Sequence, residues 1–287
     1  MKELSKGYNI VGLSQGSLIG RGIVEFCEGA PPVRNLISVA APQAGVASIP
    51  LNAGGTTVRT IANSIMKAGA YSDYAQKRFA PTGYIKLPKL YILFWQNIKG
   101  YLKSCKFLPK LNNERPNDRN PAYKKRFSSL KNLVLIMNEN DTTIRPKESS
   151  WFGYYEDGST KKVLQPREVP SSCNSLSYTP KVYIDFTSGL YCSQKNRFIS
   201  SCFNNSTPVS LLLVRQLRHD GHMLDSVSTN GNVTNSQFNL QTKLYMEDWI
   251  GLKKLDKAGR VKFIKVEGNH LQISGAELLH YIIPYLQ

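Results

Sequence analysis

Three side chains of this sequence have the types needed for nucleophilic catalysis: Ser14, Asp141 and His270. A serine hydroxyl becomes a strong nucleophile when a histidine accepts its proton, and a carboxylate can orient that histidine. The serine comes first, the acid second and the histidine last, an order that one large class of hydrolases uses. The three residues together predict a triad that transfers an acyl group.

Ser14 lies in the sequence Gly12-Leu13-Ser14-Gln15-Gly16, which has the pattern G-x-S-x-G. The apolar run before it predicts a strand, and residues 18–27 predict a helix. A serine at such a sharp turn needs small neighbours, and its hydroxyl then projects at the top of a sheet. The backbone N–H of Gln15, at the start of the helix, could bind an oxyanion. The pattern alone is common, and the strand and helix around it make it more specific.

The other two candidates each follow a predicted strand. Residues 133–137 are apolar and precede Asp141, and residues 261–266 alternate in polarity and precede His270. The carboxyl ends of parallel strands meet at one edge of a sheet, so both side chains should lie near Ser14. The alternative for Asp141 is an ordinary loop or helix-capping residue.

The remaining histidines are weaker candidates. Two of them lie in a polar stretch, residues 169–241, and one lies in a predicted closing helix, residues 274–286, where packing or surface roles are more common. These three are His219, His222 and His280.

The element order predicts an α/β fold with a mostly parallel sheet. The elbow strand, its helix and a buried strand at residues 35–41 form a right-handed parallel unit. Residues 50–130 interrupt the strands with helical spacing at 57–74 and an aromatic run at 90–95. We expect this region to form a helical cap over the site, suited to an apolar substrate. The alternative is that its apolar side chains simply pack on the sheet.

The composition limits the partners of the chain. Its 287 residues, 41% of them hydrophobic, can form one large domain, and the formal net charge is +17. The basic residues are spread along the chain without a nucleic-acid-binding motif, so we expect no nucleic-acid partner. No run is apolar enough for a transmembrane segment, and the polar first ten residues do not predict a signal peptide. The oligomeric state stays open.

The cysteines do not predict a metal site. Five are present, an odd number, and their spacings match no zinc-binding pattern. They are Cys27, Cys105, Cys173, Cys192 and Cys202. Glycosylation sequons begin at Asn140, Asn204, Asn205 and Asn232, and they matter only if the chain enters the secretory pathway.

Five short blocks together resemble the palmitoyl-protein thioesterase family, especially its plant forms. They are residues 12–16, 35–39, 140–142, 150–155 and 267–272. The resemblance covers residues 5–168 and 242–287. The blocks Trp-Phe-Gly-Tyr-Tyr and Gly-Asn-His-Leu-Gln are far more specific than G-x-S-x-G.

The resemblance implies an α/β-hydrolase fold and a hydrolase that removes long-chain fatty acyl groups from protein cysteines. It maps the catalytic triad onto Ser14, Asp141 and His270, with Gln15 as an oxyanion donor. It implies no metal and no cofactor. The substrates would be S-acylated proteins or peptides and fatty acyl thioesters, and the compartment the lysosome, the vacuole or the secretory pathway.

Two departures from the family pattern predict defects. Only seven residues precede Tyr8, where the family has its first strands and the loop with the second oxyanion donor. We therefore expect an unpaired sheet edge beside the elbow strand, and Cys27 without its disulfide partner. A cysteine pair expected just after residue 50 is also absent.

The second departure is residues 169–241, a stretch rich in Ser, Asn and Thr that contains three of the five cysteines. We expect residues 1–168 and 242–287 to form the hydrolase domain, and 169–241 to be a disordered or non-native insert. Such an insert could be a translated intron or a lineage-specific addition. The alternative function is a catalytically impaired fragment that at most binds acyl chains or partners, and a lesser rival is a lipase or esterase that prefers oxygen esters.

Overall fold

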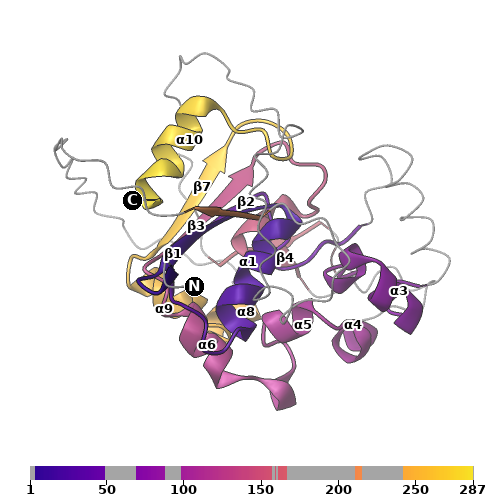
Figure 1. Cartoon of the computed structure of the whole chain (residues 1–287). Coiled ribbons are helices and arrows are strands. Elements are labelled where there is room, and N and C mark those ends of the chain that lie inside the picture. Colours follow the sequence, from indigo (N-terminus) through magenta and orange to yellow (C-terminus); the bar gives the residue numbers. More distant parts are fainter. Residues whose placement is uncertain are drawn as a thin grey trace, which may run out of the picture.

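The computed structural model describes residues 4–48, 69–87, 98–156, 159, 161–166, 211–214 and 242–286. Its centre is a five-stranded sheet in the order β6-β1-β2-β3-β7 (Figure 1). The strands are β1 (Tyr8–Leu13), β2 (Val33–Val39), β3 (Asn132–Asn138), β6 (Leu211–Val214) and β7 (Val261–Val266). A separate two-stranded sheet joins β4 (Tyr154–Tyr155) and β5 (Val163–Leu164).

Four neighbouring strands, β1, β2, β3 and β7, run parallel to one another. Their carboxyl ends therefore share one edge of the sheet, and the loops that follow β1, β3 and β7 meet there. This arrangement confirms the predicted α/β fold with a mostly parallel sheet.

Helices cover both faces of this sheet, and the alternation of side chains along the strands explains why. On one face, Ile10, Leu36 and Leu135 pack with residues of α1, α6 and α9. On the other face, Val11 and Ile37 pack with residues of α10 and the turn after it. These helices are α1 (Gln15–Phe26), α6 (Pro121–Phe127), α8 (Lys243–Met246), α9 (Leu252–Lys257) and α10 (Gly275–Tyr281), followed by η5 (Ile283–Tyr285).

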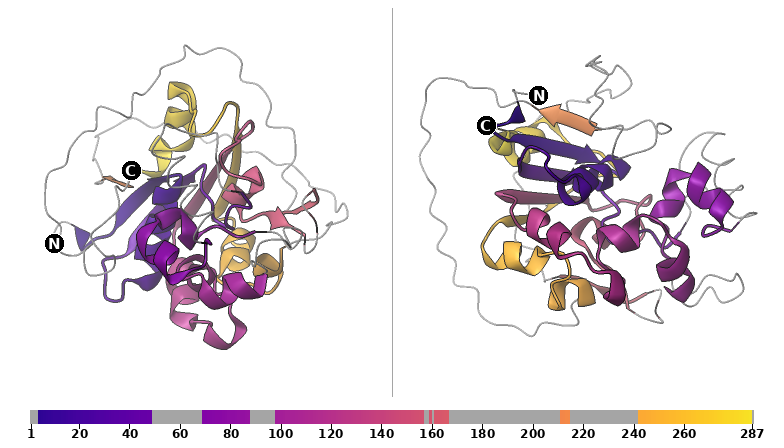
Figure 2. Two further views of the ribbon diagram at one scale, coloured as in Figure 1. Left: turned by 90° about the vertical axis from the view of Figure 1, so that its right-hand side faces the viewer. Right: turned by 60° about the horizontal axis from the view of Figure 1, so that its bottom comes forward.

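Short helices before α6 gather on the outer side of α1, away from α10 (Figure 2). They are α3 (Asp73–Arg78), η2 (Ala80–Gly83), α4 (Ile98–Ser104), α5 (Leu108–Leu111) and η3 (Pro116–Asp118), and η4 (Lys147–Trp151) follows β3. An apolar cluster around Leu18, Tyr101 and Leu108 joins them to α1. We call residues 69–87 and 98–118 the cap region. Residues 57–68 and 90–95, from which we expected a helix and an aromatic run, lie outside the described residues.

Although α6 lies inside the region expected to form the cap, its Phe127 is buried in the core cluster beside α1. The helix therefore belongs to the layer that covers the sheet. A proline at its first turn and an Asn120 side chain that accepts from the Ala122 N–H define its start.

Two expectations about the sheet edge and the cysteines are wrong. The edge of β1 is paired, because β6 adds to it in antiparallel orientation from Asn9↔Val214 to Gly12↔Leu211. Cys27 is disulfide-bonded, and its partner lies outside the described residues. Cys105 is a free, buried cysteine. Of the stretch 169–241, the described residues 211–214 form this strand, and the prediction for the rest stays a prediction.

Gly12 permits the close approach of β1 and α1. A Cβ atom at this position would lie 2.4 Å from the Cα of Ser17, a backbone atom that cannot rotate away. We expect Gly12→Ala to lower the free energy of unfolding by about 1–3 kcal/mol, the usual cost of overpacking a core. Urea denaturation measures this, and an unchanged midpoint would contradict it.

Candidate active site

Ser14 occupies the turn between β1 and α1 in a strained backbone conformation. Its φ is 48° and its ψ is −124°, which L residues rarely adopt. The Ser14 N–H donates to the Val39 carbonyl oxygen at 2.8 Å, so the neighbouring strand β2 holds the turn in place. The predicted helix exists, and it begins at Gln15, directly after the serine.

The structure brings Ser14, His270 and Asp141 into one chain of hydrogen bonds. The Nε2 atom of His270 lies 3.0 Å from Ser14 Oγ, and its Nδ1 atom lies 2.7 Å from Asp141 Oδ2. The carboxylate of Asp141 is fully buried, whereas the imidazole of His270 is 19% exposed. The imidazole therefore contacts both the Ser14 hydroxyl and solvent.

The second oxygen of Asp141 is held by the backbone. Its Oδ1 accepts hydrogen bonds from the N–H groups of Thr143 at 2.8 Å and Ile144 at 2.9 Å. These bonds fix the carboxylate and leave Oδ2 for His270, which places a hydrogen on Nδ1 and a lone pair on Nε2. In this tautomer the imidazole can accept the serine proton.

The loop with the acid and the loop with the histidine bind each other directly. The Asn140 N–H donates to the Gly268 carbonyl oxygen at 3.0 Å, and Asn138 Nδ2 donates to the Gln272 carbonyl oxygen at 2.6 Å. Asp141 and His270 are thus positioned by one main-chain and one side-chain contact, which join the end of β3 and the loop after it to the loop that follows β7. Sequence reasoning did not find the supporting role of Asn138, because only the tertiary structure places it beside Gln272.

Gln15 directly follows Ser14 in the turn. It is the first residue of α1, where a backbone N–H has no acceptor within the helix. Its side-chain Oε1 accepts a hydrogen bond of 3.2 Å from the Tyr84 hydroxyl of the cap region. The sequence gives no signal for Tyr84, which lies 69 positions further along the chain.

Behind the elbow, a fully buried arginine on α1 connects several elements. Arg21 donates to Glu25 at 2.8 Å, to Gln43 at 2.9 Å, to Asn112 at 3.0 Å and to the Leu111 carbonyl oxygen at 3.1 Å. We call these five residues the Arg21 cluster. It ties α1 to the loop after β2 and to the cap region.

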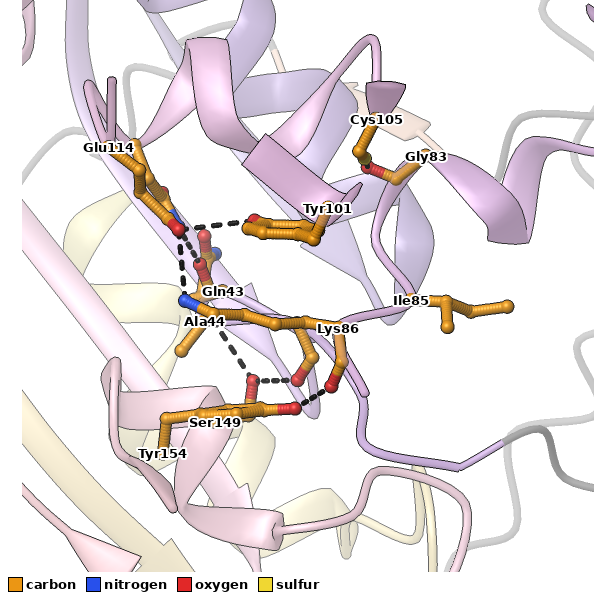
Figure 3. A network of polar contacts seen from close by, with 12 residues as sticks. Gln43, Ala44, Gly83, Ile85, Lys86, Tyr101, Cys105, Glu114, Ser149 and Tyr154 are labelled. Carbon is orange, nitrogen blue, oxygen red and sulfur yellow. Dashed lines mark hydrogen bonds and ion pairs between the residues drawn. The ribbon is translucent and has the colours of Figure 1, made fainter. Parts of the chain in front are cut away.

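A second group of contacts continues from this cluster into the cap region (Figure 3). Glu114 accepts from Asn112 at 3.0 Å, from Tyr101 at 3.2 Å and from Lys86 at 2.9 Å. The Tyr154 hydroxyl donates to the Lys86 carbonyl oxygen. The segment around Lys86 is therefore fixed by Glu114, which contacts the Lys86 side chain, and by Tyr154 of β4, which contacts its carbonyl oxygen.

From the buried Glu25 we expect the free energy of unfolding to depend on pH. Burial raises the pKa of this carboxyl from 4.5 to about 7, while Arg21 and Arg126 act in the opposite direction. The pKa of Glu25 is higher in the folded than in the unfolded chain, so Glu25 contributes stability that is fully present below pH 4.5. As the pH rises toward 7, this contribution is lost, and the free energy of unfolding falls by about 3 kcal/mol. Urea denaturation at several pH values measures this loss, and Glu25→Gln should remove it. An equal pH dependence in this variant would contradict the prediction.

The described ranges contain neither a metal-binding cluster nor a membrane span. No three side chains of His, Cys, Asp or Glu converge there as a metal ion requires. None of the helices in these ranges combines the length and the apolarity that crossing a membrane demands.

Comparison with known protein families assigns the chain to one of them. The family model described as palmitoyl protein thioesterase matches residues 1–186 and 222–270, which include the elbow, Asp141 and His270. The chain belongs to the palmitoyl-protein thioesterase family. The matched ranges also extend into the stretch 169–241 from both ends.

Curated thioesterases from several organisms are similar to this chain. Palmitoyl-protein thioesterase 1 of Caenorhabditis elegans is 30% identical over 281 residues, which cover 98% of this chain and 66% of that protein. Palmitoyl-protein thioesterase 3 of Dictyostelium discoideum is 34% identical over 162 residues, 56% of this chain and 51% of that protein. Lysosomal thioesterase PPT2 of Mus musculus is 29% identical over 175 residues, 59% of this chain and 52% of that protein. The chain thus spans between about half and two thirds of the length of these relatives.

Proposed function

We propose that this chain hydrolyses fatty-acyl thioesters on protein cysteines, with Ser14 as nucleophile, His270 as base and Asp141 as orienting acid. The observation that carries the proposal is the hydrogen-bond chain from Ser14 Oγ through His270 to Asp141. Two further observations support the proposal. Ser14 lies in a strained turn between a strand and a helix, and the chain belongs to the palmitoyl-protein thioesterase family. Such a chain of contacts activates a serine hydroxyl for acyl transfer.

In the first half of the reaction, His270 Nε2 takes the Ser14 proton as Oγ attacks the thioester carbonyl carbon. The carbonyl oxygen becomes an oxyanion, which the Gln15 N–H stabilises at the start of α1. The tetrahedral species then collapses, the carbon–sulfur bond breaks, and the cysteine sulfur takes the imidazolium proton and leaves as a thiol. A thiolate leaves more readily than an amine, so this step needs less acid assistance.

In the second half, a water molecule takes the place of the thiol. His270 accepts a proton from the water, whose oxygen attacks the acyl-enzyme carbonyl, and the bond to Ser14 Oγ then breaks. The fatty acid leaves, and Oγ recovers its proton from His270. Throughout, Asp141 keeps the imidazole in the required tautomer and stabilises its charged form.

The substrates in this proposal are S-acylated proteins or peptides, and the compartment is the lysosome or an equivalent one. Several similar proteins are named lysosomal thioesterases.

The test measures thiol release from a palmitoyl-cysteine peptide and alcohol release from the matched oxygen ester, using the whole chain. We expect thioester cleavage well above the buffer rate, faster than oxygen-ester cleavage, and labelling of the chain by a fluorophosphonate. A preference for the oxygen ester would favour a lipase or esterase. Binding of the acyl peptide without turnover or labelling would support the catalytically impaired fragment and contradict the proposal.

A further inference from the structure

The contact between Tyr84 and Gln15 joins the cap region to the residue that follows the nucleophile. The Tyr84 hydroxyl donates to Gln15 Oε1 at 3.2 Å, and the Gln15 N–H is the oxyanion donor of the proposed function. We propose that Tyr84 is a positioning residue that holds Gln15, and through it the oxyanion donor, in the reacting geometry. This inference rests on the proposed thioester hydrolysis.

The backbone of Tyr84 is well fixed, as a positioning residue requires. Its carbonyl oxygen accepts from the Val46 N–H at 3.0 Å, and the Lys86 N–H donates to the Val46 carbonyl oxygen at 2.8 Å. A Cβ at Gly45 would lie 2.9 Å from the Tyr84 carbonyl oxygen, so the loop after β2 approaches this segment closely. The contacts of Lys86 with Glu114 and Tyr154 hold the same segment from the other side (Figure 3).

The side chain of Tyr84 is supported as well. It packs against the apolar cluster that includes Leu18 of α1 and Leu108 of α5. Burial raises the pKa of the Tyr84 phenol well above its ordinary value, so the hydroxyl stays protonated and remains a donor at any assay pH.

The position of Gln15 in the turn explains why a hydrogen bond to its side chain matters. It directly follows Ser14, whose backbone is strained, and a glutamine side chain that is free to change rotamer would cost entropy to order. The hydrogen bond from Tyr84 selects one rotamer and restrains the residue whose N–H must point at the oxyanion. Catalysis by such donors depends on their orientation before the reaction begins.

The test uses Tyr84→Phe, which removes the hydroxyl and keeps the ring. We expect kcat for a palmitoyl thioester to fall about fivefold with KM unchanged, as for the loss of one neutral hydrogen bond in the transition state. The rate of fluorophosphonate labelling should fall by the same factor, since it needs the elbow but no thioester. The matched control is Tyr245→Phe, which loses the hydroxyl contact of Tyr245 with Asp256 between α8 and α9, outside the network that holds Tyr84. Its kcat should not change.

A double-mutant cycle separates positioning from a structural role. Gln15→Leu keeps the backbone N–H and removes the acceptor, so we expect a similar fall in kcat, with no further fall when Tyr84→Phe is added. A lower melting temperature with unchanged kcat, or a further fall in the Gln15→Leu background, would overturn the inference. A parent chain that neither hydrolyses thioesters nor reacts with fluorophosphonate would overturn the proposed function too, whereas an active parent with an unaffected Tyr84→Phe variant would overturn this inference alone.

Discussion

Replacing Ser14 with alanine is expected to lower the rate of thioester hydrolysis by about 10⁶-fold, the scale of nucleophile loss in serine hydrolases. The variant keeps the Gln15 N–H and the His270–Asp141 pair, but no atom remains to form the acyl-enzyme. The small rate that survives should come from the oxyanion donor and from binding. Thiol release from a palmitoyl-cysteine peptide, followed with purified protein, measures it.

Ser17→Ala is the matched control for this experiment. Ser17 lies on α1, three positions after Ser14, and its buried Oγ has no hydrogen-bond partner among the described residues. This variant should keep the activity of the parent chain. A Ser14→Ala protein with more than a few per cent of the parent rate, although folded, would show that Ser14 is not the nucleophile.

Replacing Arg21 with methionine is expected to lower the free energy of unfolding by about 3–5 kcal/mol, the cost of breaking a buried ion pair from one side. Glu25 would then stay buried without its partner, and the acceptors on Gln43 and Asn112 would lose a donor. Methionine has a similar length, so lost packing contributes little. Urea denaturation at neutral pH measures the change.

Two further variants test this explanation. Arg21→Met combined with Glu25→Gln should recover a large part of the lost stability, because no buried charge remains. Lys106→Met removes an exposed ion pair with Asp73, whose side chains are 51% and 80% exposed, and should cost at most about 1 kcal/mol. A cost for Arg21→Met no larger than that of Lys106→Met would contradict the prediction.

Local sequence patterns were sufficient to predict the framework of the site. The glycines around Ser14 predict the elbow, and the apolar runs before Asp141 and His270 predict strands whose ends point to the same sheet edge. The structure has β7 at the predicted residues, and β3 is one residue longer at each end. These features depend on residues close together in the chain, so the pattern of a short segment determines them.

The supports of the site depend on residues far apart, and only the tertiary structure decided them. Arg21 carries a charge and would pass for a surface residue, yet it is buried because acceptors from Gln43 and Asn112 converge on it. The contact of Tyr84 with Gln15 likewise joins residues that are 69 positions apart in the sequence.

The pairing of the sheet edge and of Cys27 also depends on residues far apart in the chain, which local sequence patterns do not predict. We expected an unpaired edge and an unpaired cysteine, but β6 pairs with β1 and Cys27 is disulfide-bonded. A strand edge and a thiol accept any partner that the chain brings within reach, whatever its position in the sequence. The sequence by itself thus determined which residues are candidates for acyl transfer, and long-range packing decided which contacts hold them in place.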